Sequence, residues 1–189
     1  MNILIFLGSP RKNGNSEQLL RKIIQGIEQN SGKWEFIRLA ELDIHPCIGC
    51  GSCEKTGNCV FDDDMQPLYK KIGHADRIII GSPIYFYSVT AQTKVFIDRC
   101  QTLWSRKYIL KQKTGHQNNR RGYLVSVAAS HGKRVFEGAK LTVRYAFDAM
   151  DFSYADDLLI RGVNTQNALT NRADELQQAI NLGLNLSRG

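Results

Sequence analysis

The sequence predicts an α/β fold in which five parallel strands form a doubly wound sheet with helices on both faces. Apolar runs alternate with helical patterns along the chain, and the runs are nearly continuous, as in strands covered on both sides. The chain has 189 residues, of which 42% are hydrophobic. This is enough to build a single domain, 1–189, around a continuous core.

The elements follow one another in a regular order. The expected strands are the apolar runs 2–8, 34–39, 77–82, 123–129 and 157–162. The expected helices occupy 16–29, 64–73, 91–104, 134–149 and 171–186. The first helix carries an apolar stripe through Leu19, Ile23 and Ile27, and Asn15 precedes it as a capping residue. Ligands of such a sheet bind outside the carboxyl ends of the strands, so the loops that follow the strands are candidate sites.

The loop GSPRKNGNS, residues 8–16, follows the first strand and runs directly into a helix. A helix start offers unpaired N–H groups and the positive end of a dipole, which together bind phosphate. The loop lacks both the Lys-Ser/Thr ending of a nucleoside-triphosphate site and the glycine spacing of a pyrophosphate site, so a phosphate monoester fits best. The expected phosphate-binding residues are Ser9, Arg11, Asn13, Gly14, Asn15 and Ser16. The alternative is a loop that is merely well capped.

The loop after the third strand offers a run of apolar and aromatic side chains. Pro83 stiffens this loop, and it is followed by Ile84, Tyr85, Phe86 and Tyr87. Such a surface suits a flat ligand such as the isoalloxazine ring of a flavin. The alternative is that the aromatic residues pack on the next helix or on a second subunit.

A third loop, ASHGK at 129–133, follows the fourth strand and is expected at the same edge of the sheet. Ser130, His131 and Gly132 are therefore further candidates for contact with the ring. His131 is also a candidate for contact with a bound substrate, with an ordinary turn histidine as the alternative.

A cysteine-rich loop at 45–63 contains the segment CIGCGSCEKTGNC. Its cysteines Cys47, Cys50, Cys53 and Cys59 have the spacing C-x2-C-x2-C-x5-C, which suits a [4Fe–4S] cluster. Structural zinc more often uses two C-x2-C pairs separated by a longer insert, and a loop without metal is the third possibility. Because the loop follows the second strand, we expect it at the flavin end of the sheet, within reach for electron exchange.

The segments GSPRKNGNS and SPIYFYSVTAQTKVFIDR resemble the flavodoxin-like NAD(P)H-dependent FMN reductase superfamily over most of residues 1–100. The segment CIGCGSCEKTGNCVFDDDM resembles the cysteine loop of its iron–sulfur flavoproteins. The resemblance implies FMN, strand order 2-1-3-4-5 and a homodimer or homotetramer. It also implies a flavin-dependent oxidoreductase that moves electrons between a reduced donor, either NAD(P)H or a ferredoxin-like protein, and a small acceptor.

Two other functions stay open at this point. One is a cluster-free NAD(P)H-dependent FMN or quinone reductase, and the other is a non-catalytic flavin electron carrier. Flavodoxin carriers are typically acidic, whereas this chain has 25 Lys and Arg against 18 Asp and Glu. The excess of basic over acidic residues therefore argues against a flavodoxin-type electron carrier.

Basic residues are concentrated between Arg99 and Arg134, where no acidic residue occurs. Such a field favours anionic partners, and the segment 106–121 is expected to guide NADPH or an acidic ferredoxin toward the flavin. The residues expected to line the approach are Lys107, Lys111, Lys113, Arg120 and Arg121. A solvated basic face is the alternative, and nucleic acid is an unlikely partner because no nucleic-acid-binding motif accompanies the charge.

The chain shows no membrane-spanning run and no leader, so a cytoplasmic protein without membrane contact is expected. A reducing compartment keeps thiols free, which favours metal or redox chemistry over disulfides in the cysteine loop. Cys100 is expected to be a small buried residue, and Asp98 and Arg99 to be structural or at a subunit contact.

Overall fold

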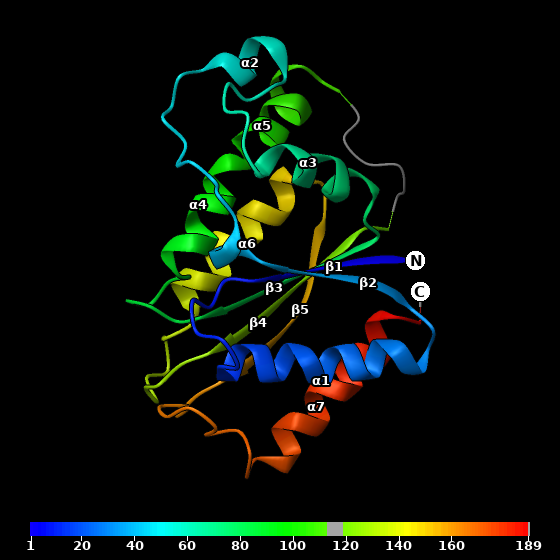
Figure 1. Ribbon diagram of the computed structural model, residues 1–189, viewed down its shortest axis with the longest axis vertical. Coiled ribbons are helices and arrows are strands. Elements are labelled where there is room, and N and C mark those ends of the chain that lie inside the picture. Colours follow the sequence, from blue (N-terminus) through cyan, green and yellow to red (C-terminus); the bar gives the residue numbers. More distant parts are fainter. Residues whose placement is uncertain (113–118, 189) are drawn as a thin grey trace.

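The computed structural model of the chain describes residues 1–112 and 119–188. Five parallel strands form one sheet in the order β2-β1-β3-β4-β5 (Figure 1). The strands are β1 (Asn2–Leu7), β2 (Lys33–Arg38), β3 (Arg77–Pro83), β4 (Arg121–Val127) and β5 (Ser153–Ile160). The predicted fold class and strand order are confirmed.

Helices cover both faces of the sheet, as Figure 1 shows. They are α1 (Asn15–Gln29), α2 (Ser52–Thr56), α3 (Met65–His74), α4 (Ala91–Arg99), α5 (Gln101–Trp104), α6 (Glu137–Ala149) and α7 (Ala173–Leu186), with a 3-10 turn η1 (Leu39–Glu41) and a π-helical turn η2 (Ser105–Ile109). On one face Ile5 packs with α1 and α7, and on the other Phe6 packs with Phe96 and Phe147 from α4 and α6. Within the described residues no helix combines the length and apolar character needed to cross a bilayer.

The start of α1 differs from its predicted form. Asn15 is the first residue of the helix and not its cap, and Gly14 precedes it without a side-chain capping hydrogen bond. The reason is that Nδ2 of Asn15 donates to the carbonyl of Thr165 at 2.8 Å, in the loop after β5. The side chain therefore connects two loops and does not cap its own helix.

The helix predicted at 91–104 is also interrupted. α4 ends at Arg99, α5 begins at Gln101, and the chain then widens into the π-helical turn η2. Cys100 lies at the break and is 1% exposed, as predicted for a small buried residue. Burial raises the pKa of its thiol.

Over its described residues, 106–112 and 119–121, the basic segment does not line the flavin edge as predicted. Arg120 is 4% exposed and donates to the carbonyls of Ala75 and Met150 at 3.0 Å, with its guanidinium 3.8 Å from the ring centroid of Phe152. Arg120 precedes β4, at the amino edge of the sheet, and its hydrogen bonds connect neighbouring elements. Lys107 pairs with Asp148 and Asp151, and Lys113 lies outside the described residues.

Candidate functional site

A cavity of about 170 Å³, which we call the flavin cavity, opens at the carboxyl edge of the sheet, where the loops after β1, β3, β4 and β5 meet. Residues that the sequence predicted for cofactor binding make up much of its lining, namely Ser9, Arg11, Gly14, Asn15, Ser16, Pro83, Ile84 and Tyr85. The position agrees with the rule that ligands of a doubly wound sheet bind beyond the carboxyl ends of its strands.

The start of α1 forms the polar end of the flavin cavity. Among the described residues no side chain caps the 15-residue helix, so its first N–H groups are open to a ligand. Ser9 and Ser16 are buried beside it, and Oδ1 of Asn15 is buried without a hydrogen-bond partner among the described residues. N–H donors suit a phosphate and the Asn15 oxygen suits a hydroxyl, so this end fits the phosphate and ribityl chain of FMN.

Asn13 does not line the flavin cavity, although the sequence predicted it as a phosphate donor. Its backbone has a φ of +55°, and its N–H donates to Oε2 of Glu17 at 2.8 Å. Burial would raise the pKa of Glu17, but hydrogen bonds from Arg38 and Asn13 outweigh burial and lower the pKa. The Glu17 carboxylate therefore fixes the shape of the loop, and contact of Asn13 with a cofactor stays a prediction.

The aromatic loop after β3 forms a tight hairpin. Tyr85 and Ser88 exchange two backbone hydrogen bonds of 2.9 and 3.0 Å, and the two residues between them have positive φ, +49° at Phe86 and +63° at Tyr87. Aromatic residues rarely adopt this conformation, which the loop holds at a cost in strain. Phe86 is fully exposed, and neither it nor Tyr87 lines the flavin cavity.

Only the start of the loop after β4 reaches the cavity lining, through Ala129. Ser130, His131 and Gly132 do not line the flavin cavity. A Cβ on Gly162 would lie 2.3 Å from Cε1 of His131, so the imidazole packs against that glycine in the loop after β5. Contact of these three residues with a ligand stays a prediction.

The sequence reasoning missed lining residues that come from the end of β4, the start of the loop after it and the loop after β5. These are Val127, Ala129, Val163, Asn164 and Gln166. A signal was present, because the polar run after the fifth strand must reach the same edge of the sheet as the other three loops. The prediction considered only the loops after the first four strands.

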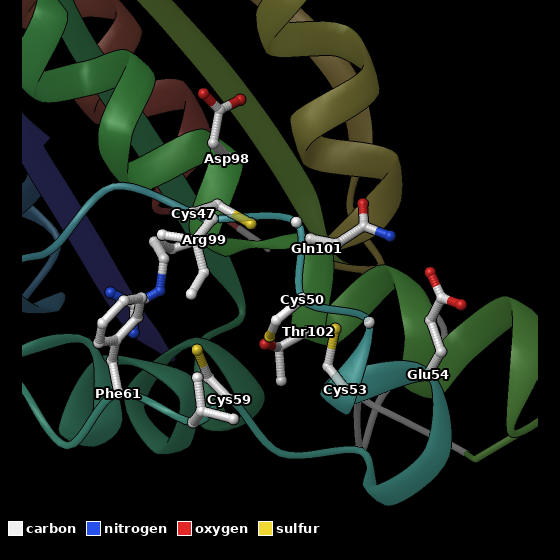
Figure 2. A pocket seen from close by; sticks show the side chains of 14 residues that line it. Cys47, Cys50, Cys53, Glu54, Cys59, Phe61, Asp98, Arg99, Gln101 and Thr102 are labelled. Atoms are coloured by element: carbon white, nitrogen blue, oxygen red, sulfur yellow. The ribbon is translucent and has the colours of Figure 1, made fainter.

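The four cysteines of the predicted metal set line a second cavity, of about 390 Å³, which we call the cysteine cavity. Figure 2 shows their sulfur atoms around a common space. Cys47 and Cys50 are exposed, whereas Cys53 and Cys59 are half-buried. Within the described residues, no three His, Cys, Asp or Glu side chains are gathered closely enough to hold a single metal ion. The cysteines instead border a larger space.

Glycines allow the loop to turn around this cavity. Gly49, Gly51 and Gly57 have φ of +64°, +70° and +72°, in the left-handed region where only glycine is unstrained. Gly51 and Gly57 bracket α2, which carries Cys53. The loop thus makes its tight turns at glycines.

The cysteine cavity is not at the flavin edge, which corrects the prediction. It is lined by Asp98 and Arg99 at the end of α4, whereas α4 begins just after the hairpin beside the flavin cavity. Nine helical residues span about 14 Å at 1.5 Å each, and the two cavities share no lining residue. The reason is that the loop leaves β2 through η1 and then extends over α3 and α5 (Figure 1).

An ion pair closes the base of the cysteine loop. Arg99 donates to both carboxylate oxygens of Asp63, at 2.5 and 3.0 Å, and to the carbonyl of His45 at 2.7 Å. Burial would raise the pKa of Asp63, but hydrogen bonds from Arg99 and from the backbone of His45 and Met65 lower it to about 2. The pair therefore stays charged and joins the two ends of the loop.

The turn η2 holds the tip of the loop. Ser105 donates its hydroxyl to Sγ of Cys53 at 3.4 Å, and Arg106 donates to the carbonyl of Gly57 at 2.6 Å. π-helical turns are rare and are frequent at functional sites. Here the wider turn presents two consecutive side chains to the cysteine loop.

Comparison with known proteins finds a matching family and several similar sequences. Residues 1–154 match the model of a family described as NADPH-dependent FMN reductase. An iron–sulfur flavoprotein of Methanocaldococcus jannaschii is 39% identical over 131 residues, 69% of this chain and 63% of that protein. One from Archaeoglobus fulgidus is 39% identical over 99 residues, 52% of this chain and 45% of that protein. The matches thus span less than two thirds of each relative.

The fold has close structural counterparts. The solved structure of an NAD(P)H:quinone oxidoreductase from Methanothermobacter marburgensis superposes with a TM-score of 0.74 at 17% identity, covering 100% of this chain and 97% of that one. At this identity the likeness concerns the fold alone. The family match and the sequence relatives carry the assignment, and the chain belongs to the NADPH-dependent FMN reductase family, in which it is similar to the iron–sulfur flavoproteins.

Proposed function

We propose that the chain is an FMN-dependent oxidoreductase of the iron–sulfur flavoprotein type, which passes electrons between a reduced donor and a small acceptor. One observation carries the proposal: four cysteines border one cavity in a chain whose sheet edge also holds a cavity suited to FMN. The printed names of the relatives, iron–sulfur flavoproteins, support the same reading. A cytoplasmic location is a further part of this proposal.

The residues of the flavin cavity have distinct roles in the proposal. The start of α1, with Ser9 and Ser16, holds the phosphate, and Arg11 adds a positive charge. Ile84 and Tyr85 provide the surface for the ring. When bound, FMN supplies transfer of electrons either as a hydride or one at a time.

The cysteine cavity is proposed to hold a [4Fe–4S] cluster through Cys47, Cys50, Cys53 and Cys59. Its volume of about 390 Å³ is many times the roughly 30 Å³ that one water occupies in the liquid, so it suits a group of several atoms better than one ion. When bound, such a cluster supplies one-electron transfer. The chain's own contribution is four thiolates on a loop fixed at its base and its tip.

We also propose that copies of the chain form a homodimer or homotetramer. Fully exposed Phe86, with Tyr85 and Tyr87 beside it at 43% and 56% exposure, forms an aromatic tip of the kind that contacts another chain. Light scattering should give a mass of two or four chains. The variant Phe86→Ser should shift that mass toward the monomer.

The proposed donors are NADPH and a ferredoxin-like protein, and an anaerobic stopped-flow experiment tests them. Purified protein with its cofactors is mixed with each donor while flavin absorbance is followed. Bleaching by NADPH in a protein that lacks iron would support the cluster-free reductase instead. Bound FMN that no donor reduces at a useful rate would support a non-catalytic carrier.

A double variant tests the phosphate assignment. Arg11→Glu with Ser16→Ala should weaken FMN binding at least about tenfold, or about 1.4 kcal/mol. Lys12→Glu is the matched control, because Lys12 neighbours Arg11 and is exposed but does not line the flavin cavity. Wild-type FMN affinity in the double variant, or native FAD in place of FMN, would contradict the assignment.

A further inference from the structure

Arg99 is a buried charge in the wall of the cysteine cavity. Its side chain is 1% exposed, and it lines the cavity at the end of α4 (Figure 2). The acidic residues in that wall differ from it, because Glu54 is exposed and Asp98 is 43% exposed and paired with Lys94. A fully buried cation beside four thiols needs an explanation, since burying a charge is costly.

The contacts that close the loop use only some of the hydrogen-bond donors of the Arg99 guanidinium. Its two terminal nitrogens donate to Asp63 and to the carbonyl of His45, and the ring of Phe61 lies 5.0 Å from its central carbon. Its Nε–H is buried and has no hydrogen-bond partner among the described residues. A buried donor without a partner is destabilising, so the absence of a partner for this N–H calls for an explanation.

The ion pair is oriented relative to the cavity. Arg99 lines the cysteine cavity, whereas Asp63, whose side chain is 3% exposed, does not. The positive member therefore lies on the cavity side and the negative member lies behind it. Such a pair stabilises negative charge in the cavity even though its own net charge is zero.

We propose, on the basis of the cluster binding proposed above, that Arg99 is a positioning residue whose buried charge and free Nε–H raise the reduction potential of the cluster. Arg99 favours the reduced state because uptake of one electron makes the cavity contents more negative by one charge, with no bond made or broken. The electron comes from the donor, which is oxidised by one electron. Hydrogen bonds and charge around a metal group are recognised means of setting its potential.

The test uses the anaerobically prepared protein with its cofactors. The variant Arg99→Gln with Asp63→Asn replaces the ion pair by two amides and leaves no charge unpaired. Arg99→Lys keeps the charge but loses the Nε–H and the planar fork. Lys55→Gln is the matched control, because it removes an exposed cation from α2 that does not line the cavity. The cluster potential is measured by dithionite titration followed by electron paramagnetic resonance, with iron and sulfide counted in each sample.

We expect the neutral pair to lower the equilibrium constant for one-electron reduction at least tenfold, which is 59 mV for one electron. Arg99→Lys should shift it by less than half as much, and Lys55→Gln should leave it at the wild-type value. If the neutral pair does not retain iron, Arg99→Lys should still retain iron and show only its smaller shift in potential, as expected when the charge is needed to hold an anionic group.

Full iron in the neutral pair with an unchanged potential would overturn the role of Arg99. So would failure of Arg99→Lys to restore iron when the neutral pair has lost it and Arg99→Lys has native circular dichroism. These outcomes differ from failure of the proposed function itself. That failure would appear as wild-type protein without iron and sulfide after anaerobic reconstitution.

Discussion

The flavin cavity and the cysteine cavity are built in different ways. The flavin cavity uses the sheet itself: strand ends, the uncapped start of α1 and short loops place its walls. The cysteine cavity lies in a long excursion from the sheet, held at its base by the Arg99–Asp63 pair and at its tip by Ser105 and Arg106. The backbone topology determines the first site, whereas a few long-range side-chain contacts determine the second.

The largest expected effect comes from breaking the base of the cysteine loop. Asp63→Ala leaves the Arg99 guanidinium buried without its partner, and loss of one member of such a pair is destabilising by about 3–5 kcal/mol. Urea unfolding measures this loss. The exposed neighbour Asp62 is the control, since Asp62→Ala should change stability by less than about 0.5 kcal/mol. Equal stability of the two variants would show that the pair does not hold the loop.

A second experiment disturbs the flavin cavity and leaves the cysteine loop intact. A Cβ on Gly8 would lie 1.7 Å from Oγ1 of Thr93, so Gly8→Ala should push the phosphate loop away from α4. We expect a loss of stability of about 1–3 kcal/mol and FMN binding weakened at least about tenfold, with iron content unchanged. Gly132→Ala, with its nearest contact at 3.4 Å, is the control for stability alone. Loss of iron together with FMN in Gly8→Ala would show that the two sites are not independent.

The low pKa of Asp63 predicts acid sensitivity. Its pKa of about 2 in the folded chain lies below the ordinary 3.8, so it contributes stability above the ordinary pKa. That contribution, about 2 kcal/mol, is lost as pH falls from about 5 to about 2. Urea unfolding at pH 6, 4 and 3 should show the loss in wild type. In Asp63→Asn this part of the pH dependence should disappear, and a wild-type profile in that variant would contradict the prediction.

A smaller effect is expected at the hairpin beside the flavin cavity. Phe86→Asn with Tyr87→Gly introduces residues that accept positive φ, and relief of the strain should stabilise the chain by about 1–2 kcal/mol. Thermal unfolding measures the gain. Phe86→Ala with Tyr87→Ala removes the rings but keeps the strained backbone, so it should give no gain. Equal gains would mean that ring exposure, not strain, was responsible.

The smallest expected effect is at the tip of the cysteine loop. Ser105→Ala removes the hydroxyl that donates to Sγ of Cys53. A weak hydrogen bond of about 0.5 kcal/mol corresponds to a fall in cluster potential of about 20 mV for one electron. Potentiometric titration resolves such a shift. Thr102→Val is a useful control, because Thr102 lines the cavity but makes no described hydrogen bond to a cysteine.

The sequence predicted the sheet and the flavin edge because both follow from local patterns. Apolar runs and the loop after the first strand are contiguous in the chain, and topology then brings the loops together. The position of the cysteine loop could not be predicted from local patterns, because it depends on contacts between residues far apart in sequence, such as Asp63 with Arg99. The role of Arg120 was missed for a similar reason. Its carbonyl partners on other elements, such as Ala75 and Met150, have no signature in a charge count.

The central claim is that four cysteines hold a cluster in a chain that separately holds FMN. It is tested most directly by measuring iron, sulfide, zinc and FMN per chain in anaerobically prepared wild type, Cys50→Ala and Cys100→Ala. We predict about four irons and four sulfides with stoichiometric FMN in wild type, loss of iron but not FMN in Cys50→Ala, and wild-type values in Cys100→Ala, whose thiol is buried elsewhere. Full iron in Cys50→Ala, or stoichiometric zinc in wild type, would contradict it.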